Sequence, residues 1–347
     1  MTHPLDLVPQ LGHEQVVFCQ DPAAGYHAII AVHSTALGPA TGGTRYWPYA
    51  TTADALLDVL RLSRGMTYKN AAAGLALGGG KAVIIGDPRR QEGRADLFRA
   101  HGRFVDRLGG TFITGEDVGV SPADLEVSAT MSRYIAGIDG MGGDPSPWTA
   151  KGVLRGIQAC AVHRWGRADL TGRTMVLQGC GNVGGHLAQL LRAAGARLVV
   201  TDADPVRAAR TASAVDGTNV LPDEIYDQPG DMFVPCALGA ILNDTTIPRL
   251  RVEVVCGAAN NQLQAPHHAE ALASRGVLYA PDYIVNAGGV ISGSIALLGE
   301  TPEGMAARVH NIHDTLLTVL DLASRDGVTT AAAADRYAEA RLREGRG

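Results

Sequence analysis

A Gly-rich turn enclosed by a predicted strand and a predicted helix restricts the fold more than any other stretch. Residues 174–179 are apolar and prone to form a strand, and residues 179–184 (GCGNVG) open a helix that we expect to end near Ala194. The next apolar run, 198–202, ends on Asp202. A G-x-G-x-x-G turn between strand and helix, followed by an acid about twenty residues on, is typical of a Rossmann dinucleotide-binding fold.

Asp202 also bears on the choice of dinucleotide. An acid at this place accepts hydrogen bonds from the ribose hydroxyls of NAD and repels the 2′-phosphate of NADP, so we expect NAD. Arg207 is an opposing charge, although it is equally suited to pair with Asp202 or Asp204. The residues of this unit expected to hold NAD are Gly179, Gly181, Asn182, Val183, Gly184 and Asp202.

Strand-like and helical runs alternate along the chain, which predicts an α/β fold. The runs at 232–237, 252–258 and 277–280 are expected to extend a parallel sheet whose loops gather at one edge. Residues 13–35 read as two strands, and a helix is expected over about 53–65. The length of 347 residues fits two domains. A Gly-rich stretch at 137–147 reads as the hinge between them.

Two lysines lie in the apolar, Gly-rich stretch 66–81 (MTYKNAAAGLALGGGK), although the chain has only three lysines among 30 basic residues. The pKa of a Lys falls readily on burial, and a desolvated Lys can act as acid or base near neutral pH. We therefore expect Lys69 and Lys81 to be functional. The alternative is two lysines that reach into water from a helix end. The glycines at 78–80 would let a ligand or another backbone segment approach closely.

Two adjacent acids follow the predicted strand 111–114, at its carboxyl end, where the sites of α/β proteins lie. Such a Glu116-Asp117 pair is commonly a solvated turn or a helix cap. The more specific hypothesis is that Asp117 faces the lysines.

Composition argues against several classes of partner. The net charge of −5 gives no reason to expect nucleic acid or an anionic membrane, and no apolar run has the length of a membrane span. No signal peptide is visible, and the five cysteines are scattered in apolar segments, so we expect buried thiols in the cytoplasm. No metal site is expected, because His267 and His268 are adjacent, which we interpret as an exposed pair on a helix.

Eight motifs in order make the sequence similar to the glutamate/leucine/phenylalanine/valine dehydrogenases over essentially its full length. The resemblance is to the branch that acts on branched-chain and aromatic amino acids, and residues 16–21 and 28–45 look most like valine dehydrogenases. The motifs are GPATGGTR (38–45), GMTYKNAAAGLALGGGK (65–81), ITGEDVG (113–119), PSPWTAKGV (145–153), QGCGNVGG (178–185), VPCALGA (234–240), GAANNQL (257–263) and APDYIVNAGGVI (280–291).

The resemblance implies an NAD-dependent L-amino-acid dehydrogenase, which converts an amino acid reversibly into the 2-oxo acid and ammonia. It implies a substrate-binding and oligomerisation domain over residues 1–140, joined by the C-terminal helix at about 328–347. A Rossmann domain over 141–327 and a deep cleft between the two domains are implied as well. The expected partners are the small-molecule substrates and further copies of the chain, in a homo-oligomer of two or more.

The resemblance also assigns roles to residues. Lys81 is implied to be the catalytic lysine that activates water, and Asp117 to carry protons to and from the substrate nitrogen. Lys69 and Asn260 are implied to hold the substrate α-carboxylate. Further implied substrate positions are Thr41, Gly42, Gly43, Met66, Gly115, Glu116, Val290, Gly293 and Ser294. Further implied cofactor positions are Thr149, Cys236, Ala237, Ala259, Asn261 and Asn286.

Departures from the family pattern concern the side-chain pocket. Thr41 stands where glutamate-specific members carry a Lys, so a glutamate side chain would leave a buried carboxylate unpaired. Gly115 stands where leucine-type members carry Ala, and Gly293 where leucine- and valine-type members carry Val. The pocket is thus expected to be enlarged and to suit a phenyl or indole ring, whose polar tip the hydroxyls of Thr41 and Ser294 could contact.

Two alternatives remain open at this stage. A branched-chain (valine/leucine) dehydrogenase has the same chemistry with a smaller substrate, whereas a dinucleotide-binding sensor without turnover belongs to another class. Lys151 replaces what is usually Tyr, Phe or Val in the family, and the sequence offers no physical explanation for it.

Overall fold

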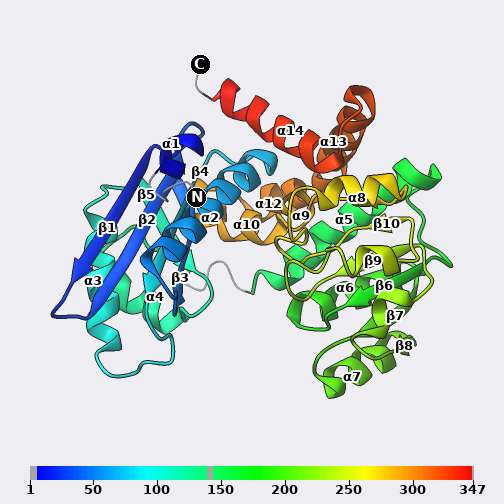
Figure 1. The fold of residues 1–347 in the computed structure, drawn as a ribbon, viewed down its shortest axis with the longest axis horizontal. Coiled ribbons are helices and arrows are strands. Elements are labelled where there is room, and N and C mark those ends of the chain that lie inside the picture. Colours follow the sequence, from blue (N-terminus) through cyan, green and yellow to red (C-terminus); the bar gives the residue numbers. More distant parts are fainter. Residues whose placement is uncertain (1–5, 139–143, 346–347) are drawn as a thin grey trace. The chain divides into compact units, whose positions relative to one another are not determined.

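The computed structural model describes residues 6–138 and 144–345, and the chain divides into two compact units (Figure 1). Unit 1 comprises Met1–Gly143, Ala296–Gly299 and Ala338–Gly347, and unit 2 comprises Asp144–Ile295 and Glu300–Tyr337. The middle of the predicted hinge, residues 139–143, lies outside the described residues.

Unit 1 is built on a mixed sheet with the strand order β1-β2-β4-β3-β5. The strands β1, β2 and β4 pair antiparallel, whereas β3 pairs in parallel with both β4 and β5. The strands are β1 (Gln15–Asp21), β2 (Tyr26–Ser34), β3 (Ala40–Trp47), β4 (Gly78–Ile85) and β5 (Phe112–Glu116). The helices that begin in this unit's first segment are α1 (Leu7–Gln10), α2 (Thr52–Ala72), α3 (Arg94–Asp106) and α4 (Pro122–Ala129).

The helix predicted over 53–65 begins as expected, with the Thr51 hydroxyl accepting a hydrogen bond from the Asp54 amide, but it continues to Ala72. It continues because the residues after 65 include no proline and end in three alanines, the best helix formers. It stops before Gly74, whose φ of 68° is left-handed. This extension carries Lys69 on the helix.

Side chains of β4 alternate between the two faces of the unit 1 sheet. Ala82 packs into a core with α3 and α4, and Val83 packs into a second core with α2, which lies along the sheet in Figure 1. Because alternate residues share a face, Lys81 lies on the α2 side with Val83. Gly79 shares this face, and a Cβ there would be 2.1 Å from the amide nitrogen of Thr67 in α2. The close approach expected at this glycine is therefore made by protein backbone.

Unit 2 contains a fully parallel sheet with the order β11-β10-β9-β6-β7-β8. This is the order of a Rossmann fold, with the direction of winding reversed between β6 and β9, so the predicted fold is confirmed. The strands are β6 (Thr174–Gln178), β7 (Arg197–Thr201), β8 (Thr218–Asn219), β9 (Met232–Pro235), β10 (Val254–Val255) and β11 (Leu278–Tyr279).

The helices of the second half connect and cover these strands. They are α5 (Ser146–Trp165), α6 (Asn182–Ala193), α7 (Pro205–Val215), α8 (His268–Ser274), α9 (Asp282–Val285), α10 (Gly288–Gly293), α11 (Ile295–Leu298), α12 (Pro302–His310), α13 (Ile312–Asp326) and α14 (Thr330–Glu344), with 3-10 turns η2 (Glu224–Asp227) and η3 (Ile247–Arg249). Within residues 6–138 and 144–345, no helix combines the length and apolarity needed to cross a membrane.

The last helix, α14, belongs to both units. Its first part lies in unit 2, where the Tyr283 hydroxyl donates to Asp335 at 3.0 Å. Its end lies in unit 1, where the Tyr68 hydroxyl of α2 donates to Glu339 at 2.9 Å.

Two expectations about burial are wrong in part. Four of the five cysteines are buried thiols, whereas Cys236 is only half-buried because it begins the loop after β9. His267 is exposed as expected, but His268 is buried, and its ring forms hydrogen bonds with Ala265 and Asp244.

Candidate functional site

The structure brings Lys81 and Asp117 together in unit 1. The Lys81 Nζ lies 2.9 Å from Asp117 Oδ2, and the side chains are 8% and 20% exposed. Lys81 projects from β4, while Asp117 follows β5, so β3 runs between the two strands. Gly43 of β3 makes this reach possible, because a Cβ there would lie 2.9 Å from Asp117 Cβ and clash with the Glu116 carbonyl. Asp117 thus faces Lys81, as the more specific hypothesis expected for one of the two lysines.

Three residues that the sequence analysis did not select extend this pair. Arg45 on β3 donates through Nε to Asp117 Oδ2 at 3.1 Å and through Nη1 to Asp58 Oδ2 at 3.0 Å. The Tyr49 hydroxyl donates to the same Asp58 oxygen at 2.5 Å. Two cations thus alternate with two carboxylates on the α2 side of the sheet, which balances the charge that Lys81 brings into the protein.

This environment shifts the pKa of both partners of the central ion pair. Burial lowers the pKa of Lys81 below its ordinary value, although the negative charge of Asp117 opposes the change. Burial alone would raise the pKa of Asp117, but the charges of Lys81 and Arg45 outweigh it and hold that pKa below its ordinary range. A lysine that loses its proton more readily, beside a carboxylate that stays ionised, is equipped for acid–base chemistry.

The other predicted substrate residues of unit 1 lie on α2, β3 and β5. Met66 and Lys69 lie on α2, and the first of these packs against β3, since a Cβ at Gly42 would come within 3.2 Å of the Met66 side chain. Thr41 is buried, and its hydroxyl accepts a hydrogen bond from Asn70 at 2.9 Å. Gly115 and Glu116 end β5, where Glu116 is exposed and Gly115 is half-buried.

The Gly-rich turn of unit 2 gives each of its glycines a different task. Gly179 has a φ of 97°, and a Cβ there would lie 2.8 Å from the Ala237 amide nitrogen. A Cβ on Gly184 would lie 1.9 Å from the Gly179 carbonyl, so α6 packs directly onto the turn. A Cβ on Gly181 would meet nothing within 4 Å, which leaves the backbone before Asn182, the first residue of α6, open to a ligand. Tight turn, open approach and close packing are the features that hold a pyrophosphate at a helix N-terminus.

Asp202 lies at the end of β7 beside this turn. Its Oδ2 accepts the Cys180 amide at 2.7 Å, and its Oδ1 accepts the Asp204 amide at 2.8 Å. Arg207 lies 3.4 Å from both Asp202 and Asp204, so its charge is shared between two carboxylates. A cavity of about 600 Å³ opens between α6 and α7, and its wall includes Gly181, Asn182, His186, Arg207 and Arg210.

The loops after β9 and β10 hold the remaining cofactor candidates of this sheet edge. Ala259 is buried and its amide donates to the Pro235 carbonyl at 2.9 Å, while Ala237 is exposed in the loop that begins at the half-buried Cys236. Asn261 has a left-handed φ of 51° and accepts the Ala240 amide at 2.7 Å.

Asn286 connects these loops to the helix that follows them. It is buried, and its Nδ2 donates to Asn260 Oδ1 at 2.9 Å and to the Ala258 carbonyl at 3.1 Å. Within residues 6–138 and 144–345, no donor reaches its buried Oδ1. A buried acceptor of this kind is costly unless a donor reaches it, and the carboxamide of a nicotinamide offers such a donor. The donor set and the glycine turn therefore fit a nicotinamide dinucleotide.

The predicted pocket residues of unit 2 lie on and next to α10. A Cβ on Gly293 would meet nothing within 4 Å, which agrees with a trimmed wall. Val290 is half-buried, and its carbonyl accepts the Ser294 hydroxyl at 2.7 Å. The expectation that this hydroxyl contacts the tip of a substrate is therefore weakened, because its proton is already used within the helix.

Thr149 and Lys151 both lie on α5. The Thr149 hydroxyl donates to the Pro145 carbonyl at 3.0 Å. The Lys151 ammonium lies 4.0 Å from the centre of the Trp148 ring. A cation held over an aromatic face gives the unusual lysine a local partner, which the sequence did not reveal.

Of the three residues that the sequence analysis did not select, only Arg45 could have been found from a sequence pattern. Arg45 alternates with Thr41 and Gly43 along β3, so the period of a strand places it on their face. No spacing rule joins Asp58 to Arg45, because their contact crosses from a helix to a strand.

Comparisons with known proteins agree with this arrangement. Residues 13–135 match the family model described as the Glu/Leu/Phe/Val dehydrogenase dimerisation domain, and residues 203–343 match the glutamate/leucine/phenylalanine/valine dehydrogenase model. A valine dehydrogenase of Streptomyces coelicolor is 50% identical over 353 aligned positions, covering 99% of this chain and 96% of the relative. A leucine dehydrogenase of Thermoactinomyces intermedius is 48% identical, covering 97% and 93%.

A solved structure extends the comparison to three dimensions. The crystal structure of L-tryptophan dehydrogenase from Nostoc punctiforme aligns with a TM-score of 0.90 and 45% sequence identity, covering 99% of both chains. Two matching family models, relatives near half identity and a shared fold lead to one conclusion. The chain belongs to the glutamate/leucine/phenylalanine/valine dehydrogenase family.

Proposed function

We propose that this protein is an NAD-dependent L-amino-acid dehydrogenase whose substrate has a large apolar side chain. The observation that carries the proposal is the buried Lys81–Asp117 ion pair at 2.9 Å. A dinucleotide-binding sensor without turnover has no use for a desolvated lysine held against an ionised carboxylate. The glycine turn at 179–184 and the buried acceptor of Asn286 support the nicotinamide cofactor.

A dinucleotide held by the glycine turn at 179–184 and by Asn286 would supply the hydride acceptor for oxidation of the substrate at Cα. Lys69 and Asn260 hold the substrate α-carboxylate. Lys81, as the neutral amine, takes a proton from the water that adds to the imino carbon, and as the ammonium it stabilises the oxygen of the resulting carbinolamine. Asp117 carries protons to and from the nitrogen, which leaves as ammonia. Burial lowers the pKa of Lys81, so its neutral amine forms more readily than that of an exposed lysine.

The first test is NADH formation across a panel of L-amino acids. We expect kcat/KM for L-phenylalanine or L-tryptophan to exceed that for L-valine, because Gly115 and Gly293 each lack a side chain that would limit substrate size, and a ring buries more apolar area. Each methylene position that the substrate leaves unfilled lowers the binding free energy by roughly 1 kcal/mol. The corresponding change in kcat/KM is modest, and the ratio of kcat/KM between two substrates measures it directly. Absence of turnover with every amino acid of the panel would support the sensor instead.

A branched-chain dehydrogenase is the second candidate, and the identities near 50% to a valine and a leucine dehydrogenase favour it. Gly293→Val separates the two. Because a Cβ at Gly293 meets nothing within 4 Å, the larger side chain should fit without disturbing α10. It should then lower the aromatic-to-valine ratio by about tenfold or more. A wild type that prefers valine, or a ratio that Gly293→Val leaves unchanged, would contradict the enlarged pocket.

The cofactor preference gives a separate prediction. NAD should exceed NADP in kcat/KM by at least about tenfold, because the 2′-phosphate would lie beside Asp202. Arg207 should attract the 2′-phosphate of NADP only weakly, because it already forms ion pairs with Asp202 and Asp204. Asp202→Ala should narrow the ratio, and Arg207→Ala should leave it at or above the wild-type value. Equal use of both dinucleotides by the wild type would instead identify Arg207 as a phosphate partner.

A further inference from the structure

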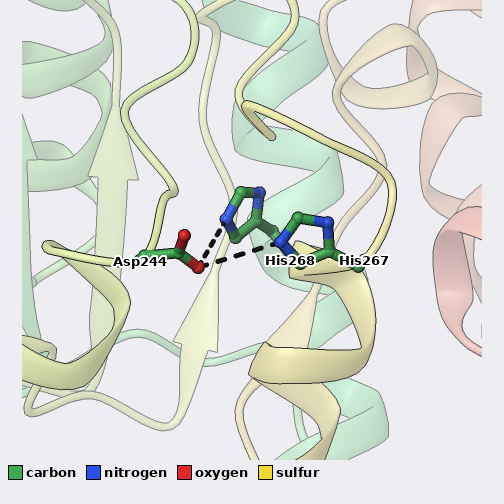
Figure 2. Close-up of side chains that lie close together, drawn as sticks. All are labelled: Asp244, His267 and His268. Atoms are coloured by element: carbon green, nitrogen blue, oxygen red, sulfur yellow. Dashed lines mark hydrogen bonds and ion pairs between the residues drawn. The ribbon is translucent and has the colours of Figure 1, made fainter.

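Three potential metal ligands meet on unit 2, and none of them belongs to the glycine turn at 179–184. Figure 2 shows the rings of His267 and His268 turned toward the carboxylate of Asp244. Asp244 Oδ1 lies 3.1 Å from His268 Nε2 and 3.8 Å from His267 Nε2. All three ligand atoms lie within 4.8 Å of one another. We propose that Asp244, His267 and His268 form a binding site for a divalent transition metal ion of the Zn²⁺ class.

The distances suit a metal without large movements. Zn²⁺ binds imidazole nitrogen and carboxylate oxygen at about 2.0–2.2 Å with tetrahedral geometry, so neighbouring ligand atoms should stand about 3.4 Å apart. The two oxygen-to-nitrogen distances of 3.1 and 3.8 Å lie on either side of that value. Two imidazoles and one carboxylate leave the fourth position to water, and this ligand set favours Zn²⁺ or Co²⁺ over Mg²⁺ or Ca²⁺.

His268 changes tautomer when it binds a metal. Its Nδ1 accepts the Ala265 amide at 2.9 Å, so without a metal Nε2 carries the proton and donates it to Asp244 at 3.1 Å. A metal at Nε2 displaces that proton, and the Ala265 carbonyl, 3.1 Å from Nδ1, is then the acceptor for a proton on Nδ1. The ring is buried and packs against the His267 ring with centroids 4.1 Å apart, so its direction is set before a metal arrives.

The backbone around the ligands is also held in place. The Asn243 side-chain oxygen accepts the amides of Thr245 and Thr246 at 3.0 and 3.1 Å, which shapes the turn that carries Asp244. On the same segment, Leu242 exchanges backbone hydrogen bonds with Gln262 and Gln264, which precede the two histidines, both at 3.0 Å. Ligands on two segments that are already paired lose little entropy on binding a metal.

This pairing gives the site a structural consequence. The same two segments meet again at the hydrogen bond from the Ala240 amide to the Asn261 carbonyl. The backbone hydrogen bonds that join these two segments begin at Asn261. A metal bound by Asp244 and the two histidines would link the same segments a second time, beyond the last of these hydrogen bonds. Metal binding should reduce opening of residues 238–246 and 261–270 without contributing to the chemistry at Lys81.

The experiment uses the full-length chain without a histidine tag, freed of metal by chelation and titrated with Co²⁺. We expect one Co²⁺ per chain, the visible absorption of a four- or five-coordinate ion, no near-ultraviolet band of a thiolate ligand, and displacement by Zn²⁺. Hydrogen exchange should slow in residues 238–246 and 261–270 when Zn²⁺ is added.

Asp244→Ala and His267→Gln test the ligands, and both positions are exposed, so the fold should be kept. Each should raise the Kd for Co²⁺ by at least tenfold. His163→Gln, an exposed histidine of α5 outside the cluster, is the matched control and should leave the Kd unchanged. Failure of the wild type to bind Co²⁺, or equal binding by both ligand variants, would overturn the proposal.

Discussion

Lys81→Ala should lower kcat by about a thousandfold or more while the affinity for NAD stays within a factor of two. The loss is large because the variant removes both the base that activates water and the cation that stabilises the developing oxyanion. NAD affinity should persist because the glycine turn and Asp202 belong to unit 2, whereas Lys81 belongs to unit 1. Steady-state kinetics and NAD titration by fluorescence measure the two quantities.

The chain's other lysines provide the controls for this variant. Lys151→Ala removes an exposed lysine whose contact is the Trp148 ring, so kcat should change less than about threefold. Lys69→Ala should instead raise KM strongly, because it removes a carboxylate contact present in both ground and transition states. Wild-type kcat in a folded Lys81→Ala protein would exclude the mechanism proposed above.

Asp117→Asn should lower kcat by about a hundred- to ten-thousandfold, the range for loss of a general acid–base group. The amide has the shape of the carboxylate but neither its charge nor its ability to take a proton. Without the Asp117 charge, burial lowers the pKa of Lys81 further, because that carboxylate is the main force raising it. The residual activity should rise with pH as Lys81 loses its proton, and this rise should occur at lower pH than in the wild type. A profile of kcat against pH measures the difference.

Asp58→Asn is the matched control for this prediction. Asp58 contacts Arg45 as Asp117 does, at 3.0 Å against 3.1 Å, but forms no ion pair with Lys81. Its loss should lower kcat less than about tenfold and leave the pH profile near its wild-type position. If both variants lost activity equally, the network would act through Arg45 and not through the Lys81–Asp117 pair.

Periodicity and turn chemistry were sufficient for the dinucleotide-binding turn of unit 2 and for the strands and helix around it, although they did not find the edge strand β8. The strand 174–178, the turn at 179–184, the helix α6 and the acid after β7 are consecutive in the chain, so local rules describe them. The same rules found the first two strands and the start of α2. They missed the extension of α2 to Ala72, because Gly65 resembles the glycine that commonly ends a helix, whereas in the structure the helix passes through it.

Residue chemistry was sufficient to select Lys81 and Asp117 as functional candidates. It was not sufficient to predict the contact between their side chains. The rarity of lysine and the placement of the acids after a strand were visible in the sequence. Their 2.9 Å contact depends on β3 lying between β4 and β5 and on Gly43 leaving room, which are facts of strand order. Arg45 and Asp58 entered the site for the same reason.

His267 and His268 show most clearly which contacts the sequence alone does not predict. The sequence showed that they are adjacent, and adjacency on a regular helix argues against a shared metal. They lie instead where a loop becomes α8, and Asp244 approaches them from a segment more than twenty residues away. Sequence by itself determined the family, the Rossmann unit and the residue types suited to the chemistry, because these depend on local order along the chain. Tertiary structure decided which charges meet and which side chains are buried, because contacts between distant segments depend on packing that no local pattern encodes.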